Sequence, residues 1–399
     1  ADSRAGSANR DVVNGFDRGA DQIDLSLIDA NTRTFGVNDA FTFIGTTGFG
    51  GTGASSAGEL RLQSLGGPNA VLVEADHNGD GVADVVCGPN GFEGPAFKAK
   101  HEIYPAVPQN RKGYADNFFS WIHDFDGDGA NDILTVGFPG KPGHVYRNPG
   151  KDALDGLWEK FVVADSVSNE SPQFTDLTGD GEAELVCTRS GHYGYFAPGT
   201  GKPFDAWTFT PISKDVAPKP FGHGLGVGDV NGDGRQDVIA RDGWLEQPAA
   251  VGTAANLGVW TFRKHPFAPA GADMFAYDVD GDGDNDIITS LSAHNYGLAW
   301  YENTPNDDGE PTFEQRLIMG DKPSDSANGL VFTEPHAVKL ADINGDGLQD
   351  IVTGKTYWSH HTQSPMWDAG AVVYWFELRR KDGGEVEFVP HKADGESGI

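Results

Sequence analysis

The sequence has few of the features that accompany membrane insertion or nucleic-acid binding. It contains no run of about 18 apolar residues, so no transmembrane helix is expected. Lys and Arg together number 29 against 59 Asp and Glu, which gives a net charge of −30. Such an excess repels phosphates, so we expect no nucleic-acid partner and no binding to an anionic membrane surface. No signal peptide is visible, and the Ala-Asp-Ser start predicts a processed or trimmed N-terminus.

Glycine and aromatic residues, by contrast, are plentiful. The chain has 55 Gly and 23 Pro among 399 residues, and 11% of its residues are aromatic. Glycine adopts positive φ at low steric cost, so this composition suits an all-β chain with many tight turns. The aromatic content supplies material for a core and excludes a disordered chain.

An acidic nonapeptide recurs six times along the chain. Its pattern is D-x-[DNT]-G-D-G-x-x-[DE], and the copies span residues 76–84, 124–132, 176–184, 229–237, 278–286 and 342–350. Positions 1, 3, 5 and 9 carry oxygen atoms, and the glycines at positions 4 and 6 allow a tight curl. Hard Ca²⁺ takes six to eight oxygen ligands, which a short loop delivers only when it curls in this way. The alternative is a purely structural turn, but six regular copies favour calcium.

The repeat therefore predicts about one Ca²⁺ per loop. The predicted metal ligands are Asp76, Asn78, Asp80, Asp84, Asp124, Asp126, Asp128, Asp132, Asp176, Thr178, Asp180, Glu184, Asp229, Asn231, Asp233, Asp237, Asp278, Asp280, Asp282, Asp286, Asp342, Asn344, Asp346 and Asp350. Without a cation each loop would hold several like charges close together, so we expect calcium to be required for stability. Calcium sites of modest affinity are filled outside cells, so we also expect a secreted, extracellular protein.

The segments around each acidic loop are typical of short strands. A β-rich run follows every copy, as in DILTVG and DIITS, and another precedes it; two more runs complete each unit of about 50 residues. Four short strands per unit predict the blade of a β-propeller, which here has six motif-bearing units. A parallel β-helix would have shorter coils, and a sandwich would not repeat its loop chemistry. Cys87 and Cys187 share one repeat position in non-neighbouring units, so we expect two buried free thiols.

Residues 1–75 do not follow the four-strand pattern. The runs DVVNGF, DQIDLSLIDA, DAFTFIG and AGELR resemble the C-terminal cap of serralysin-type RTX modules over roughly residues 9–86. The GGxGxDxUx repeats and the HExxH motif of those proteases are absent. We therefore expect a short N-terminal β module over 1–75 and a propeller over 76–399. The resemblance leaves open whether the first acidic loop belongs to the module or to the propeller.

Strand geometry predicts which side of the propeller could carry a site. Because the acidic loop joins the first two strands of a blade, residues about one strand length away on either side lie on the opposite face. His223 and His336 lie six residues before a loop, and His192, His294 and Trp358 lie eight after one. The residues predicted to line this rim are His192, Tyr193, His223, Trp244, His294, Tyr296, His336, Lys355, Tyr357, Trp358 and His360. A His cluster here suits proton transfer or a further divalent transition metal, and the aromatic rings suit stacking on sugars.

The acidic loops resemble those of FG-GAP/VCBS repeat propellers. Over about residues 92–399, runs such as GHGLGVGDVNGDG and EPHAVKLADINGDGLQDIVTGKTYW also resemble the propeller of the aldos-2-ulose dehydratase family and related bacterial propellers. That resemblance implies seven blades, a carbohydrate or sugar-derived ligand and a carbon-oxygen lyase that eliminates water from keto-sugars.

The elimination would need a base that removes a proton next to a carbonyl group. The resemblance makes His223, His294 or His336 candidates for that base, with Tyr357 or Lys355 assisting, and His192, Tyr193, Trp244, Tyr296, Trp358 and His360 candidates for substrate binding. The alternative is a non-catalytic, calcium-dependent carbohydrate-binding or adhesion module. The sequence does not determine the oligomeric state.

Overall fold

The computed structural model shows a nearly all-β chain. It describes residues 42–45, 59–61, 74–75, 82–106, 114, 116–150, 152–249, 258–268, 271–356, 361–381 and 383–395. Near the N-terminus, β1 (Thr42–Gly45) pairs with β2 (Glu59–Arg61) in parallel. Among the described residues the helical elements are the 3-10 turns η3 (Pro323–Asp325), η4 (Ala327–Gly329) and η5 (His361–Gln363). No helix in these ranges is long and apolar enough to cross a membrane.

Six antiparallel meanders of four strands follow one another along the chain. The first contains β3 (Glu74–Ala75), β4 (Asp84–Cys87), β5 (Asn90–Phe92) and β6 (Lys100–Glu102). The second contains β7 (Phe119–His123), β8 (Asp132–Val136), β9 (Lys141–Arg147) and β10 (Glu159–Val167). The third contains β11 (Gln173–Thr175), β12 (Glu184–Arg189), β13 (His192–Ala197) and β14 (Thr208–Pro211).

The remaining three meanders repeat the same order. The fourth contains β15 (Leu225–Gly228), β16 (Asp237–Ala240), β17 (Gly243–Glu246) and β18 (Thr261–Lys264). The fifth contains β19 (Asp273–Tyr277), β20 (Asp286–Ser290), β21 (Leu298–Asn303) and β22 (Phe313–Met319). The sixth contains β23 (Val338–Ala341), β24 (Asp350–Lys355), β25 (Val372–Arg380) and β26 (Val386–Asp394).

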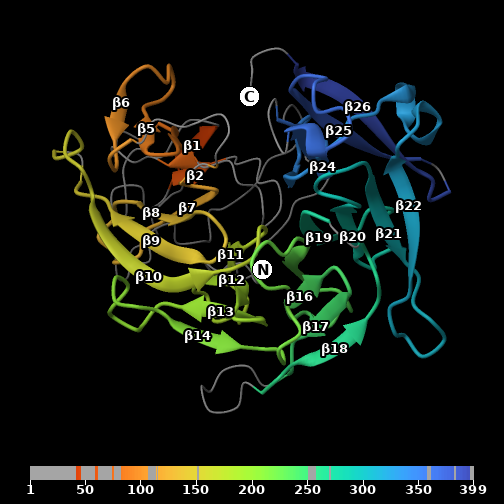
Figure 1. Cartoon of the computed structure of the whole chain (residues 1–399), viewed down its shortest axis with the longest axis horizontal. Coiled ribbons are helices and arrows are strands. Elements are labelled where there is room, and N and C mark those ends of the chain that lie inside the picture. Colours follow the sequence, from red (N-terminus) through yellow and green to blue (C-terminus); the bar gives the residue numbers. More distant parts are fainter. Residues whose placement is uncertain are drawn as a thin grey trace.

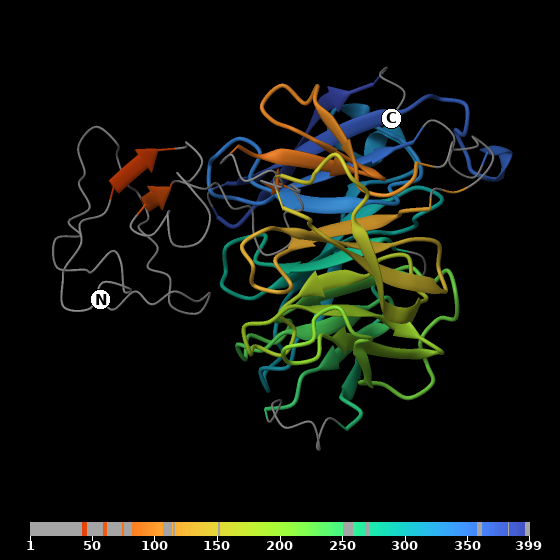
Figure 2. The same cartoon turned by 90° about the vertical axis from the view of Figure 1, so that its left-hand side faces the viewer.

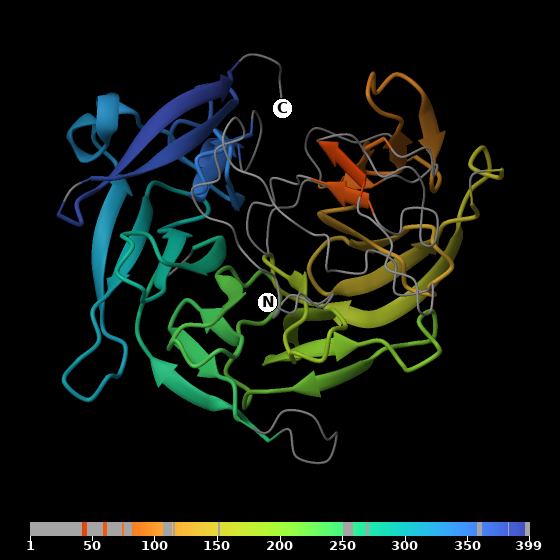
Figure 3. The same ribbon diagram turned by 180° about the vertical axis from the view of Figure 1, so that it is seen from behind.

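The meanders are arranged as blades around a common centre, in the order of the sequence (Figure 1). The last strand of each blade, such as β14, β18 or β22, lies at the periphery, and the view from behind shows the same order (Figure 3). The fourth and fifth blades join into one eight-stranded sheet because β15 pairs in parallel with β19, Leu225 opposite Asp273 and Gly226 opposite Met274. The predicted all-β, propeller-like fold is therefore confirmed. Seven blades are not confirmed, because the described residues form six.

The blades lie stacked in the edge-on view (Figure 2), and the hydrophobic core is divided among the spaces between them. Five hydrophobic clusters are found, one between each pair of successive blades; Leu134 of the second blade, for example, packs in one cluster with Leu185 of the third. Within the described ranges no cluster joins the first blade to the sixth. Strands β8, β15, β16 and β20 are buried at every residue because neighbouring blades cover both of their faces.

The acidic loops occupy the predicted place in the second to sixth blades, where the structure describes them. Each runs from the end of the first strand to the start of the second, as from Gly228 of β15 to Asp237 of β16. In the first blade, β3 ends at Ala75 and β4 begins at Asp84, and residues 76–81 between them lie outside the described residues. The domain boundary at residue 75 stays a prediction.

Candidate functional site

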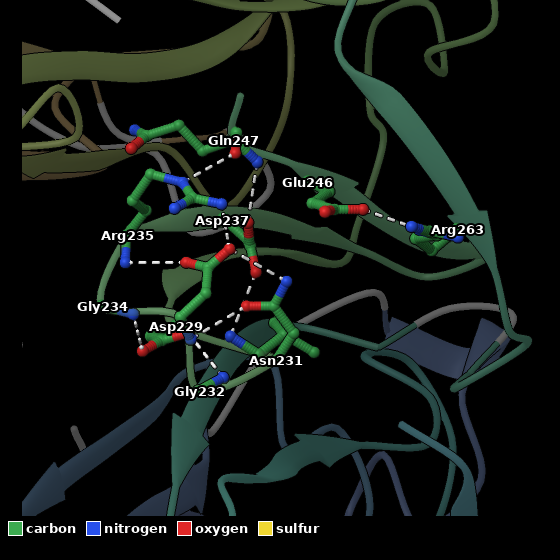
Figure 4. A network of polar contacts seen from close by, with 11 residues as sticks. Asp229, Asn231, Gly232, Gly234, Arg235, Asp237, Glu246, Gln247 and Arg263 are labelled. Atoms are coloured by element: carbon green, nitrogen blue, oxygen red, sulfur yellow. Dashed lines mark hydrogen bonds and ion pairs between the residues drawn. The ribbon is translucent and has the colours of Figure 1, made fainter. Parts of the chain in front are cut away.

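The acidic loop at 229–237 shows how the repeat folds (Figure 4). The Asp229 carboxylate accepts hydrogen bonds from the backbone N–H groups of Gly232, at 2.8 Å, and Gly234, at 2.8 Å. Asn231 donates from its amide to Asp233 Oδ2 at 3.1 Å. Both glycines have positive φ, 74° and 84°, so the first carboxylate gathers the loop around itself. The predicted role of the two glycines is confirmed at this loop.

The other described loops repeat this conformation. In the copies that begin at Asp124, Asp176, Asp278 and Asp342, the first carboxylate accepts the N–H of the glycine at position 4, and both glycines have positive φ. In three copies carboxylate oxygens lie within 4.8 Å of one another and could hold a cation. These groups are Asp124, Asp126 and Asp132; Asp176, Asp180 and Glu184; and Asp278, Asp280 and Asp282.

The ninth residue of the repeat also connects the loop to the third strand of its blade. Asp237 is fully buried, and it accepts the N–H of Val230 at 3.1 Å and that of Gln247 at 2.8 Å. These bonds tie the loop to the end of the third strand, and Asp132, Asp286 and Asp350 make the equivalent pair. Burial raises the pKa of Asp132, Glu184, Asp237 and Asp286 to about 7. Ligation by these residues stays a prediction, as does that of Asp84; Asp76, Asn78 and Asp80 lie outside the described residues.

Four side chains meet near the centre of the ring, on the side opposite the acidic loops. Glu170, His223, His294 and His336 each offer a ligand atom within 4.8 Å of the others, and we call them the central cluster. Glu170 Oε2 lies 3.1 Å from Nε2 of His223 and 3.1 Å from Nε2 of His336, and those two nitrogens are 3.1 Å apart. The ring of His294 lies 4.8 Å from that of His223 and 5.2 Å from that of His336, between centroids.

The central cluster is largely shielded from solvent. The exposed fractions of the Glu170, His223 and His336 side chains are 10%, 12% and 31%. Burial alone would raise the pKa of Glu170, but the hydrogen bonds and positive charge of His223 and His336 outweigh it and hold that pKa below its usual range. Glu170 is therefore a carboxylate under ordinary conditions and presents a negative charge to its three imidazole neighbours.

Backbone hydrogen bonds hold the cluster residues in register although they come from different blades. Glu170 donates its N–H to Gly222 O at 2.9 Å, beside His223. Glu334 donates its N–H to Asn295 O at 2.8 Å, and its own carbonyl accepts the N–H of His336 at 2.7 Å. The first contact joins Glu170 to the segment of His223, and the second joins the segment of His294 to that of His336. The four side chains are thus pre-positioned.

A cavity of about 800 Å³ opens beside the central cluster. Glu170 and His336 line it, together with Asp273, Glu334, Lys339 and Lys355. The rest of its lining comes largely from the first, second and sixth blades and is mostly apolar. These residues are Val86, Tyr114, Phe118, Phe119, Trp121, Phe138, Phe221, Val352, Val372 and Val373. This volume is in the range of small-molecule binding sites, which combine apolar walls with a few polar groups.

Two ion pairs supply further charge to the cavity wall. Lys355 and Glu334 are both 1% exposed at their side chains, and Lys355 Nζ lies 3.2 Å from Glu334 Oε2. Lys355 also donates to Thr356 O at 3.1 Å. Asp273, likewise buried, lies 3.5 Å from Lys339 Nζ and accepts the N–H of Val338. Of the predicted residues, Lys355 therefore does line the cavity.

The other predicted rim residues that the structure describes are not brought to the cluster. Tyr193 and Trp244 are buried in the cores between blades, and His192 Nδ1 lies 2.9 Å from Ser213 O. Tyr296 is half-buried next to Asn295 and does not line the cavity. Tyr357, Trp358 and His360 lie outside the described residues. The assisting role of Tyr357 in catalysis and the substrate-binding roles of the others stay predictions.

Two points differ from what the sequence predicted. Glu170 was not among the predicted site residues, although it lies six residues before the loop at 176, at the same offset as His223 and His336. Cys87 was expected to be buried, which is wrong: both thiols are free, but Cys187 is buried and Cys87 is exposed. Cys87 lies on β4 of the first blade, which faces the cavity, whereas the same position in the third blade is covered by its neighbour.

Comparison with known families decides the nature of the repeat. The model of a family described as FG-GAP-like repeat matches residues 124–187, 176–240 and 278–353. The chain therefore contains three FG-GAP-like repeats. The matched segments of these FG-GAP-like repeats include five of the six acidic loops. The finer resemblance to the aldos-2-ulose dehydratase family is not confirmed, and no curated protein matches the chain.

Solved structures resemble this FG-GAP-like repeat chain only distantly. One is a lectin of Agrocybe aegerita that recognises non-reducing terminal N-acetylglucosamine, with 18% identity and a TM-score of 0.40 over 70% of this chain and 67% of that one. A biofilm matrix protein of V. cholerae has 16% identity and a TM-score of 0.32, over 65% and 37%. The Tc holotoxin pore of Photorhabdus luminescens has 18% identity and a TM-score of 0.34, over 80% and 15%.

Proposed function

We propose that this protein is a metal-assisted carbon-oxygen lyase that acts on a keto-sugar or uronate. The observation that carries the proposal is the central cluster, in which one carboxylate and three imidazoles converge beside a cavity of about 800 Å³. A purely structural cluster would have no need to border a cavity of this size. The buried Lys355–Glu334 pair in the same wall adds groups that can exchange protons.

The chemistry of the cluster fits a divalent transition metal such as zinc. Imidazole nitrogens together with a carboxylate oxygen suit such ions, whereas calcium prefers oxygen alone. Ligands at about 2.0–2.1 Å from a tetrahedral ion lie about 3.3 Å apart. The 3.1 Å separations among Glu170 Oε2, His223 Nε2 and His336 Nε2 are close to that distance between two ligand atoms. Little movement would be needed for these three atoms to share an ion.

A bound metal ion would polarise the carbonyl or carboxylate oxygen of the substrate and so make the neighbouring C–H more acidic. Histidines that act as ligands are not available as bases, so in this proposal His223, His294 and His336 lose the role of base. The proton passes instead to Glu334, while the C–O bond breaks as the C=C bond forms. Lys355 gives a proton to the departing oxygen, and the products are the unsaturated sugar and water or an alcohol.

The acidic loops take calcium in this proposal and have a structural role. Five described loops curl around their first carboxylate with both glycines at positive φ, and three of them bring several carboxylate oxygens together. Loops that hold Ca²⁺ with modest affinity would be filled only where calcium is abundant, so we also propose an extracellular location. The test is isothermal titration of the chelated chain, for which several Ca²⁺ per chain are expected; no binding at millimolar calcium would contradict this part.

The lyase is tested by incubating the zinc- or manganese-loaded protein with keto-sugars and uronate polymers. The ultraviolet absorbance of an unsaturated product should grow with the wild type. It should be lost in His294→Ala, which removes a ligand, and in Lys355→Met, which removes the proton donor. Lys322→Met, an exposed lysine away from the cavity, is the matched control and should keep full activity. Binding of sugars without any product would instead support a carbohydrate-binding module.

A further inference from the structure

Next to the central cluster, four aromatic side chains pack against one another. Tyr114 and Phe118 precede β7, Phe138 follows β8 and Phe221 precedes β15, and we call these four residues the aromatic ledge. The centroid of Phe138 lies 5.2 Å from that of Tyr114 and 5.3 Å from that of Phe221, and Phe118 lies 5.9 Å from Tyr114. All four line the same cavity as Glu170 and His336.

The ledge is open to solvent at Tyr114 and Phe221, which is unfavourable for apolar rings, while Phe118 and Phe138 are half-buried. Tyr114 is 63% exposed and Phe221 50% exposed. A contiguous group of exposed aromatic rings usually marks a binding surface. An enclosed slot would suit an aryl or alkyl group, but a ledge with one free face suits a ring that is apolar on its face and polar at its edge. A pyranose has this character, since its hydroxyl groups can stay in water while its C–H face stacks on an aromatic ring.

The backbone at Phe221 supports a functional reason for its exposure. Its φ is 77°, in the left-handed region that bulky residues rarely adopt. Two backbone hydrogen bonds to residues 168–170 fix this conformation. Phe221 donates its N–H to Ser168 O at 3.1 Å, and the carbonyl of the next residue, Gly222, accepts the N–H of Glu170 at 2.9 Å. A strained residue that the surroundings hold in place is typical of ligand-binding sites. The same pairing places Phe221 two residues from His223 and joins its segment to that of Glu170.

We propose that the aromatic ledge is a second sugar subsite, so that the preferred ligand is an oligosaccharide and not a single sugar. This inference rests on the proposed function, in which the reacting ring lies at the central cluster. The adjoining ring then stacks on Phe221 and Tyr114. The ledge contributes binding of the longer ligand and takes no part in the bond changes.

The test is to compare the affinity of the metal-loaded protein for a monosaccharide and for its trisaccharide, by calorimetry. The probes are galacturonate and trigalacturonate, glucose and cellotriose, and N-acetylglucosamine and its trimer. With at least one pair, the wild type should bind the trisaccharide about tenfold more tightly than the monosaccharide, which is the scale of one stacked ring. Equal affinity within every pair, or no binding by any probe, would overturn the inference.

Phe221→Gly separates stacking from folding. Glycine adopts positive φ without strain, so this variant should melt at the same or a higher temperature than the wild type while the trisaccharide loses its advantage. Affinity for the monosaccharide should not change. Phe262→Ala, at a half-exposed Phe on β18 outside the ledge, is the matched control and should keep the advantage. A Phe221→Gly protein that still prefers the trisaccharide as the wild type does would contradict the proposal.

The outcome is distinguishable from failure of the lyase proposal. Binding and product formation are measured separately, so a length-dependent affinity with no unsaturated product would refute only the lyase. Equal product formation from a monosaccharide and its trisaccharide, with equal affinity, would refute only the second subsite.

Discussion

At the scale of single residues, the ninth position of the acidic repeat can be tested by a stability measurement of its own. Asp237→Ala removes an acceptor from the N–H groups of Val230 and Gln247 and leaves both donors inside the protein. Hydrogen bonds to charged groups contribute about 1.5–3 kcal/mol each, so the free energy of unfolding should fall by about 3 kcal/mol. Urea denaturation in saturating calcium measures the change.

The control for Asp237 is Asp242→Ala, which removes an exposed aspartate that pairs with Arg241 on the surface. Its effect should be within about 0.5 kcal/mol of zero. If Asp237→Ala proves as mild as Asp242→Ala, the ninth position does not tie the loop to the third strand.

Glu170 shows how far single residues of the site could be predicted from the sequence. His223, His294 and His336 were found because the repeat sets their distance from an acidic loop, and the structure brings them together. Glu170 obeys the same offset, but carboxylates abound in this chain and only the histidines stood out. Tyr193 and Trp244 also lie near a predicted offset, yet their side chains turn into the cores between blades. The offset from an acidic loop tells at which end of a strand a residue lies. The alternation of side chains along the strand decides which face of the sheet that residue points to.

At the scale of elements, the parallel pairing of β15 with β19 depends on a glycine. A Cβ atom at Gly226 would lie 2.0 Å from the carbonyl oxygen of Met274 on the neighbouring blade. Gly226→Ala should therefore separate the two inner strands and lower the free energy of unfolding by about 1–3 kcal/mol or more, as overpacking does. Thermal or urea unfolding checks this.

Gly258→Ala is the matched control for that variant. A Cβ atom at this position would have no other atom within 4 Å, and the φ of Gly258 is not positive, so the stability of the variant should be close to that of the wild type. Equal stability of the two variants would mean that the blades do not need this close approach.

The strands and loops could be predicted because each is encoded locally and repeated. Every acidic loop carries its own glycines, and every flanking run has its own β-branched residues. The junction of β15 with β19 could not be predicted in this way, since it depends on the distance between blades. The exposure of Cys87 was missed for the same reason: the repeat specifies a position on a strand but not which blade covers it.

At the scale of the whole molecule, the acidic loops give the calcium-free protein an unusual pH dependence. Asp132, Glu184, Asp237 and Asp286 have pKa values raised to about 7 by burial, against about 4 in an unfolded chain. Between those values the folded chain holds more protons than the unfolded chain, so its stability falls as the pH rises from 5 to 7. In chelator, the melting temperature should be higher at pH 5 than at pH 7.

Calcium should reverse this behaviour, because it binds the ionised carboxylates and is released when they are protonated. With millimolar calcium the melting temperature should be higher at pH 7 than at pH 5. A chelated protein that melts at a lower temperature at pH 5 would contradict the raised pKa values. Burial lowers the pKa of His123, His144 and His265, and these groups favour the folded chain at pH 7 over pH 5. The four carboxylates outweigh them because there are more of them and each has its pKa raised across the whole window, whereas Glu377, with a pKa lowered to about 2, titrates below it.

The number of blades was the least predictable feature at this scale. Six acidic loops gave six units, and the described residues form six blades with a core cluster at each of the five junctions between neighbours. The closing junction contains the cavity, where residues of the first and sixth blades face one another. A local repeat encodes each blade, but the closure of a ring depends on the sum of the angles between blades.

The most direct test of the account is the metal content of the protein after it has been equilibrated with calcium and equimolar zinc and then separated from free ions. The account predicts about one zinc per wild-type chain, the same in His192→Ala, and almost none in His294→Ala, with the calcium content alike in all three and the melting temperatures alike when calcium is present and zinc is left out. Zinc retained equally by His294→Ala, or absent from the wild type, would contradict a metal centre formed by Glu170 and the three histidines.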